Sequence, residues 1–134
     1  MSRGPRHTVI ALAALTALFA ARVTGQALVA FLGVSWLPPM AAWYSGLLSY
    51  PILLPLQVII LATQLAIDVG VWRGHPKIVG PYPRLGQGIE RLSCAYALAM
   101  ALRALITRTH PIPIVFHWVL AAYLFVVGRF WARQ

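Results

Sequence analysis

The apolar stretch from Tyr50 to Asp68 constrains the fold of this chain more than any other part of its sequence. A transmembrane helix needs about 20 predominantly apolar residues, and this stretch with its continuation to Trp72 is long enough. It also carries Gln57, Gln64 and Asp68, whose spacings of seven and four residues place them on one helical face. Polar side chains that face lipid are costly, so we expect this face to be turned toward other helices.

The composition indicates that lipid surrounds the rest of the chain as well. Of the 134 residues, 60% are hydrophobic and 10% are charged, against about 25% charged in soluble domains. The mean hydropathy is +0.78. A small soluble domain buries only about two-thirds of its chain surface, which is too little to hide so many apolar side chains. We therefore predict one domain, an all-α integral membrane four-helix bundle.

Four apolar runs predict the four spans of this bundle, at residues 8–34, 51–72, 89–107 and 111–130. Residues 35–50 hold prolines and aromatic residues of the type found at a membrane–water boundary. We expect an interfacial loop there, with a short helix lying flat around residues 40–48. Dense proline and glycine predict an irregular cytoplasmic loop over residues 73–88, and a tight turn is expected at 108–110.

The distribution of basic residues predicts the orientation of these spans. The net charge is +9. Two bases precede the first span, four follow the second and two lie near the C-terminus, whereas residues 35–50 have none. The positive-inside rule then predicts that both termini lie on the cytoplasmic side of the membrane. We expect this membrane to be a bacterial inner membrane. A nucleic-acid partner is not expected, because its binding site would gather the bases on one polar face.

Each predicted span carries a polar side chain at a similar depth. At a rise of about 1.5 Å per residue, Arg22, Gln57, Arg103 and His117 lie about 18–20 Å from the cytoplasmic side. We predict that these four residues and Gln26 form a ligand-binding layer. Its excess positive charge suits an anionic lipid head group, a carbonyl-bearing ring such as a quinone, or a carboxylate of a partner. The alternative is that the arginines extend to the interface and the glutamines only join helices.

Other chemistries have less support in the sequence. Gln64 and Asp68 lie lower, and we expect them to be structural or proton-linked, with Asp68 paired to the third or fourth span or to the basic loop. No cluster of His, Cys and acidic residues suits a metal, and no nucleophile–His–acid set is visible, so we predict no metal site and no catalytic residue. Haem is disfavoured, because only His117 lies well inside a span.

The pattern Arg22-Val23-Thr24-Gly25 is followed by an apolar run, a loop rich in proline and aromatic residues, and three more spans. This arrangement resembles the small four-helix DoxX-type bacterial membrane proteins. The resemblance covers the whole chain in architecture but only the Arg-then-Gly feature in residues, and Arg22 lies deeper than the arginine of that family. It implies an accessory role beside respiratory or thiol-redox partners, and it carries over no catalytic residue.

Three functions remain open at this point. The first is a non-enzymatic accessory subunit of a larger redox-type membrane complex, which packs against other subunits or itself and binds lipid or quinone. The second is a component of a redox enzyme that interacts with quinone or haem through the predicted layer. The third is a homo-oligomeric anion channel or carrier.

Overall fold

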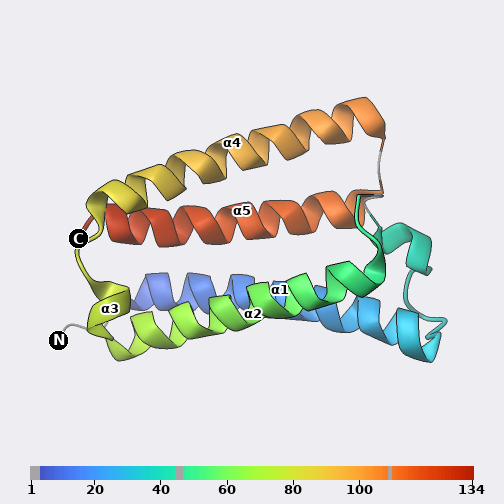
Figure 1. The fold of residues 1–134 in the computed structure, drawn as a ribbon, viewed down its shortest axis with the longest axis horizontal. Helices are drawn as coiled ribbons and strands as arrows, with labels where there is room; N and C mark the ends of the chain where they lie inside the picture. Colours follow the sequence, from blue (N-terminus) through green and yellow to red (C-terminus); the bar gives the residue numbers. More distant parts are fainter. Residues whose placement is uncertain (1–3, 45–46, 109) are drawn as a thin grey trace.

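The computed structural model describes residues 4–44, 47–108 and 110–134, and every regular element within them is helical. This result confirms the all-α prediction. Four long helices and two short ones follow one another in these ranges (Figure 1). They are α1 (Arg6–Leu32), the 3₁₀ helix η1 (Met40–Trp43), α2 (Tyr50–Arg73), α3 (Pro76–Val79), α4 (Pro83–Thr107) and α5 (Pro111–Ala132).

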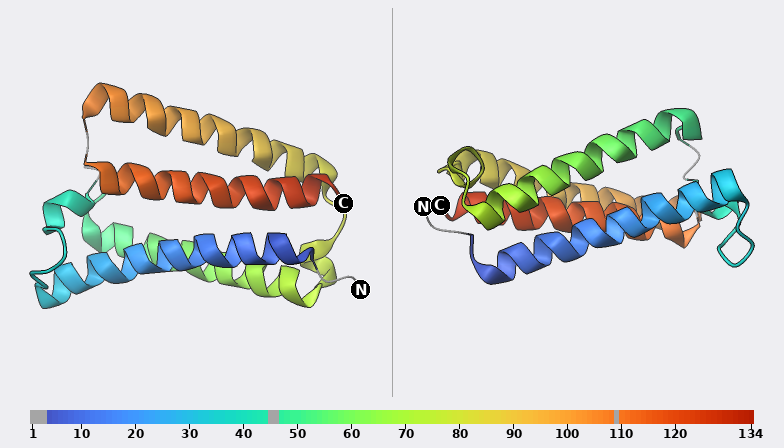
Figure 2. Two further views of the ribbon diagram at one scale, coloured as in Figure 1. Left: turned by 180° about the vertical axis from the view of Figure 1, so that it is seen from behind. Right: turned by 90° about the horizontal axis from the view of Figure 1, so that it is seen from below.

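The four long helices lie side by side, and successive ones run in opposite directions (Figure 1 and Figure 2). α1 begins and α5 ends at the same end of the molecule, where α3 also lies. We call this the termini end. The opposite end holds η1, the start of α2 and the connection between α4 and α5, and we call it the η1 end.

α1, α2 and α5 share the main apolar core. Its buried members are Leu12 of α1, Val71 of α2, and Tyr123, Val127 and Phe130 of α5. α4 packs along α5 and makes no comparable contact with α1 or α2 within the described ranges. The molecule is therefore a three-helix core with α4 attached to one side.

Three of the helices, α1, α2 and α5, are long and apolar enough to cross a membrane. α4 is as long, with 25 residues, but it carries Arg84, Glu90, Arg91 and Arg103. Length and composition of the helices thus support three of the four predicted spans.

The segment 73–88 is more regular than predicted, and the expectation of an irregular loop is wrong over much of it. α3 occupies part of the segment, and α4 already begins at Pro83. Both helices place a proline in their first turn, where the missing N–H has no intrahelical partner to lose. The Trp131 indole nitrogen of α5 donates to the Ile78 carbonyl at 2.6 Å, which holds α3 against the bundle.

The segment 35–50 also differs from the prediction. The expected flat helix over residues 40–48 is reduced to the single turn η1, and Trp43 is buried within the molecule. Residues 45 and 46 of this segment lie outside the described residues, as do Arg3 of the N-terminal segment and Thr109 of the turn before α5.

α4 and α5 approach each other closely at the termini end. A Cβ atom added at Gly86 would lie 2.3 Å from the Ala132 nitrogen and 2.6 Å from the Gly128 carbonyl oxygen. A Cβ added at Gly128 would lie 2.7 Å from the Glu90 nitrogen. These neighbours are backbone atoms and cannot rotate away, so only glycine permits the contact, as at many helix pairs in membranes.

Alanine substitutions at two glycines of α4 test this contact. Gly86→Ala is expected to force the helices apart and to lower the free energy of unfolding by about 1–3 kcal/mol, the usual cost of overpacking. Gly88→Ala is the matched control, because a Cβ there meets nothing within 4 Å. It should be neutral or stabilising by up to about 1 kcal/mol, since alanine is the better helix former. Unfolding in mixed micelles, followed by circular dichroism, measures both; equal stability of the two variants would contradict the packing.

Candidate functional site

The guanidinium of Arg22 is held inside the molecule, toward the η1 end. The residue is only 8% exposed. Its Nη1 donates to Gln26 Oε1 at 3.3 Å, one turn further along α1, and its Nη2 donates to the Trp43 carbonyl oxygen at 3.3 Å. Its Cζ lies 5.6 Å from the centroid of the Phe116 ring of α5. Arg22 therefore contacts residues of α1, η1 and α5. Its guanidinium does not extend to the surface of the molecule, as it would if the arginine only reached for the membrane interface.

Gln26 joins α1 to α2. Its side chain is fully buried, and its Oε1 also accepts a hydrogen bond from Gln57 Nε2 of α2 at 3.2 Å. One carbonyl oxygen thus accepts from two donors, one of which is charged. The bond from Arg22 involves a charge but stays within α1, whereas the bond that crosses to α2 is the neutral one from Gln57, which contributes about 0.5–1.5 kcal/mol.

The packing of Trp43 on α1 accounts for the glycine in the motif Arg22-Val23-Thr24-Gly25. A Cβ added at Gly25 would lie 2.8 Å from the Trp43 ring, so the absence of a side chain at this position lets the indole pack on α1. The indole nitrogen donates to the Pro38 carbonyl at 3.0 Å, which closes the turn that contains the paired prolines. The backbone carbonyl of Trp43 then accepts from Arg22.

Tyr96 of α4 and His117 of α5 form a second pair beside Arg22. The Tyr96 hydroxyl and His117 Nδ1 are hydrogen-bonded, and the two rings meet edge to face. Because Nδ1 is engaged, Nε2 is the imidazole nitrogen left for another group. No hydrogen bond involves that nitrogen among the described residues.

Both sets of polar groups border one groove with a volume of about 220 Å³. Arg22, Gln57, Tyr96 and His117 provide its polar side. The remaining walls are apolar and come from α1, α2, α5 and the segment before α2: Phe19, Leu47, Leu48, Leu53, Leu56, Ile60, Pro113, Phe116 and Leu120. The groove therefore combines donors and acceptors at one place with a hydrophobic surround, which is the usual make-up of a small-molecule site.

Several buried polar atoms around the groove have no partner within the described ranges. They are Arg22 Nε, Gln26 Nε2, Gln57 Oε1 and the Tyr50 hydroxyl. Buried polar groups are nearly always hydrogen-bonded, to protein, ordered water or ligand. This set includes both donors and acceptors, and two of its residues, Arg22 and Gln57, line the groove. Ordered waters would satisfy these atoms and could bridge them to a bound molecule.

Gln64 and Asp68 lie in a separate polar group between α2 and α5, nearer the termini end. The Tyr123 hydroxyl lies 2.8 Å from Asp68 Oδ1 and 3.0 Å from the Gln64 carbonyl oxygen, and it donates to them. The Gln64 side chain is 2% exposed, and neither of its amide atoms has a partner in the described part of the chain. Neither Gln64 nor Asp68 lines the groove.

Of the five residues predicted to bind a ligand, four come together here. Arg22, Gln57 and His117 line the groove, and Gln26 accepts hydrogen bonds from Arg22 and Gln57. Arg103 is partly exposed on α4 and does not line the groove, although its charge acts on the nearby His117 imidazole. Tyr96 was missed. It precedes Arg103 by seven residues and thus shares its helical face, which was a usable signal.

Within the described residues, no group of three or more His, Cys, Asp or Glu side chains is arranged to hold a metal ion. No family model, curated protein or solved structure matches this chain. The DoxX-type resemblance therefore stays a prediction, and the function has to be inferred from the geometry.

Substitutions of Gln26 test the shared acceptor. Gln26→Leu removes the oxygen and leaves the Arg22 guanidinium and the Gln57 amide without it, which should destabilise the fold by about 1–3 kcal/mol or more. Gln26→Glu is the matched control, because a carboxylate accepts from the same two donors and pairs with the guanidinium charge. Thermal unfolding in detergent compares them. A Gln26→Leu variant as stable as Gln26→Glu would contradict the described role.

Proposed function

We propose that this chain is a small bacterial inner-membrane protein that binds a quinone-type molecule in the groove and acts as a non-enzymatic accessory subunit of a larger redox complex. In this proposal α4 also crosses the membrane, as the third of four spans, and both termini lie in the cytoplasm. The observation that carries it is the groove itself, where Arg22, Gln57 and His117 meet inside otherwise apolar walls.

The groove chemistry favours a ring with carbonyl groups. Carbonyl oxygens accept hydrogen bonds, and the Arg22 guanidinium at the groove is a donor, as is His117 Nε2 in the tautomer in which Nδ1 accepts from Tyr96. The Phe116 ring and the leucines of α2 suit the flat face and the hydrophobic tail of such a molecule. A volume of about 220 Å³ accommodates a ring head group, and the open, apolar side of the groove leaves the tail in lipid.

The distribution of charge and apolar surface supports the membrane location and the accessory role. The helix ends at the termini end carry Arg6, Arg73, Lys77, Arg84 and Arg129, as the positive-inside rule requires of a cytoplasmic side. Exposed leucine and isoleucine side chains cover the outer faces of α2 and α4. A surface of this kind packs against lipid or against other membrane subunits.

A second candidate is a component that takes part in quinone redox chemistry. The Tyr96–His117 hydrogen bond favours it, because a phenol paired with an imidazole can exchange a proton with a quinone carbonyl placed at Nε2. In that case Tyr96→Phe would alter turnover of the complex while leaving quinone affinity nearly unchanged. In a purely accessory subunit the substitution would change neither.

Quinone binding is tested with two tryptophan substitutions on α2. Leu56 lines the groove and is 42% exposed, so Leu56→Trp fills the groove mouth without disturbing the core. Leu65→Trp is the matched control, because Leu65 is 50% exposed on the same helix and lies outside the groove. A short-chain quinone should raise the melting temperature of the wild type and of Leu65→Trp. Its affinity for Leu56→Trp should fall by about tenfold or more, which corresponds to about 1.4 kcal/mol.

Purification from native membranes in mild detergent completes this test. Extractable quinone and stoichiometric larger subunits are the expected findings. Equal quinone affinity of the two variants would exclude the groove as the site. A protein that carries quinone but purifies without partners would refute the accessory role alone.

A further inference from the structure

A second cavity of about 460 Å³ lies at the termini end, between the start of α1 and the end of α5. It shares no lining residue with the groove. Its walls are Pro5, His7, Thr8 and Ala11 of the α1 side, and Phe125, Val126, Arg129, Phe130, Arg133 and Gln134 of the α5 side. The function proposed above makes no use of this cavity.

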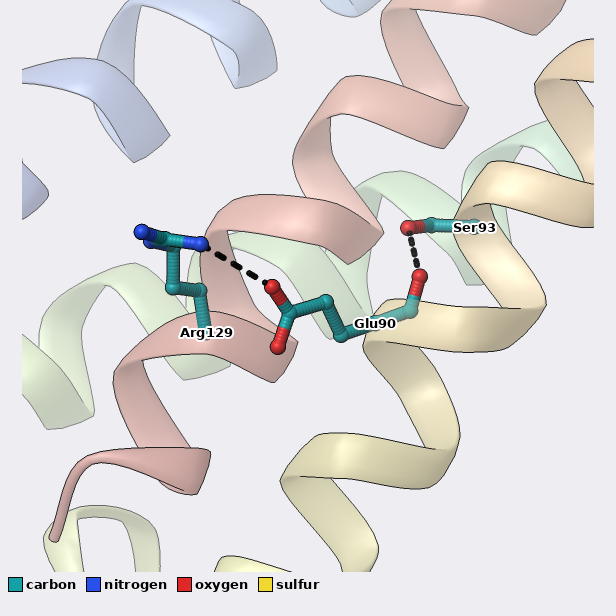
Figure 3. Close-up of polar contacts among 3 residues, drawn as sticks. All are labelled: Glu90, Ser93 and Arg129. Carbon is teal, nitrogen blue, oxygen red and sulfur yellow. Dashed lines mark hydrogen bonds and ion pairs between the residues drawn. The ribbon is translucent and has the colours of Figure 1, made fainter.

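The charge of this cavity is positive. His7, Arg129 and Arg133 line it, and no acidic residue does. Arg129 Nη1 forms an ion pair with Glu90 Oε1 of α4 at 3.1 Å (Figure 3). The Arg129 side chain remains 48% exposed, and the pair engages one of its terminal nitrogens, so the rest of the guanidinium can meet an anion.

The first turn of α1 adds to the attraction for anions. This helix of 27 residues begins after Pro5 without a side-chain cap and without an acidic residue in its first turn. Backbone N–H groups at a helix start are unpaired, and the helix dipole makes this end positive. Thr8, in that turn, is 7% exposed and lines the cavity.

The remaining wall of the cavity is apolar. Ala11 of α1 and Phe125, Val126 and Phe130 of α5 continue from the basic mouth along the seam between the two helices. A free anion gains no favourable contact from an apolar wall, whereas an acyl chain can pack against it. The combination of two guanidinium groups, a threonine hydroxyl and an adjacent apolar seam fits a phosphate group that carries a lipid tail.

We propose that this cavity binds the head group of an anionic phospholipid, with the phosphate at Arg129, Arg133 and the α1 start and an acyl chain along the α1–α5 seam. The inference rests on the proposed cytoplasmic orientation of the termini end, where the membrane surface is negatively charged. It does not depend on quinone binding in the groove.

The test uses the full chain in a neutral detergent after removal of bound lipid. The probes are phosphatidylglycerol, phosphatidylcholine with the same acyl chains, and inorganic phosphate, and the measurements are native mass spectrometry and the melting temperature. Phosphatidylglycerol should bind and raise the melting temperature, phosphatidylcholine should bind more weakly, and phosphate alone should have no comparable effect. A melting temperature raised equally by phosphate would show an anion site and refute the lipid.

Single substitutions distinguish this site from the general positive charge of the termini end. Arg133→Gln should weaken phosphatidylglycerol binding about tenfold, because it removes one charged contact to the phosphate. Arg84→Gln is the matched control, since it removes the same charge at the same end but outside the cavity. Equal weakening by both variants would overturn the proposal.

Two further variants keep the proposal independent of fold and groove. Glu90→Gln releases Arg129 from its ion pair and should tighten phosphatidylglycerol binding, and weaker binding would count against the site. Leu56→Trp should bind phosphatidylglycerol like the wild type, because it alters only the groove. Loss of lipid binding in that variant would show that the two cavities are not separate sites.

Discussion

The buried guanidinium of Arg22 is the constraint on which the η1 end of the molecule depends. An ionised group inside an apolar bundle is tolerated only where hydrogen-bond acceptors surround it. Neutral groups fill this role here: the Gln26 amide oxygen, the Trp43 carbonyl and the face of the Phe116 ring. These three partners come from α1, η1 and α5, and Gln26 also binds α2 through Gln57. The need to satisfy one charge therefore positions every element at that end except α4.

The position of α4 accounts for the groove. At the termini end, Gly86 and Gly128 bring the backbones of α4 and α5 into contact. Toward the η1 end the two helices diverge, as Figure 1 shows, and α4 makes no extensive contact with α2. The Tyr96–His117 hydrogen bond spans the two helices between these ends. This pair lines the groove together with Arg22 and Gln57, so the polar side chains of the groove come from all four long helices.

Much of this arrangement was predictable from the sequence, because the spacing of polar residues in apolar helices determines which faces turn inward. Gln57 and Gln64 follow this rule, and both are nearly fully buried. Depth counting along straight helices also brought Arg22, Gln57 and His117 to one level. It put Arg103 at that level as well, but Arg103 does not line the groove, because the rotation of α4 about its own axis depends on contacts with α5. Nor did residue type predict the burial of Trp43. The Trp43 ring packs against Gly25, and this contact depends on η1 folding back onto α1, which the sequence does not reveal.

The coupling between Arg22 and Gln26 is the most direct measure of this account. A double-mutant cycle of Arg22→Leu, Gln26→Leu and the combined variant, by reversible unfolding in mixed micelles, isolates their interaction from the cost of each single change. We predict a favourable coupling of about 1.5–3 kcal/mol, as for a buried hydrogen bond to a charged group. A coupling indistinguishable from zero would show that the guanidinium is not held where the structure places it, and the groove would lose its polar side.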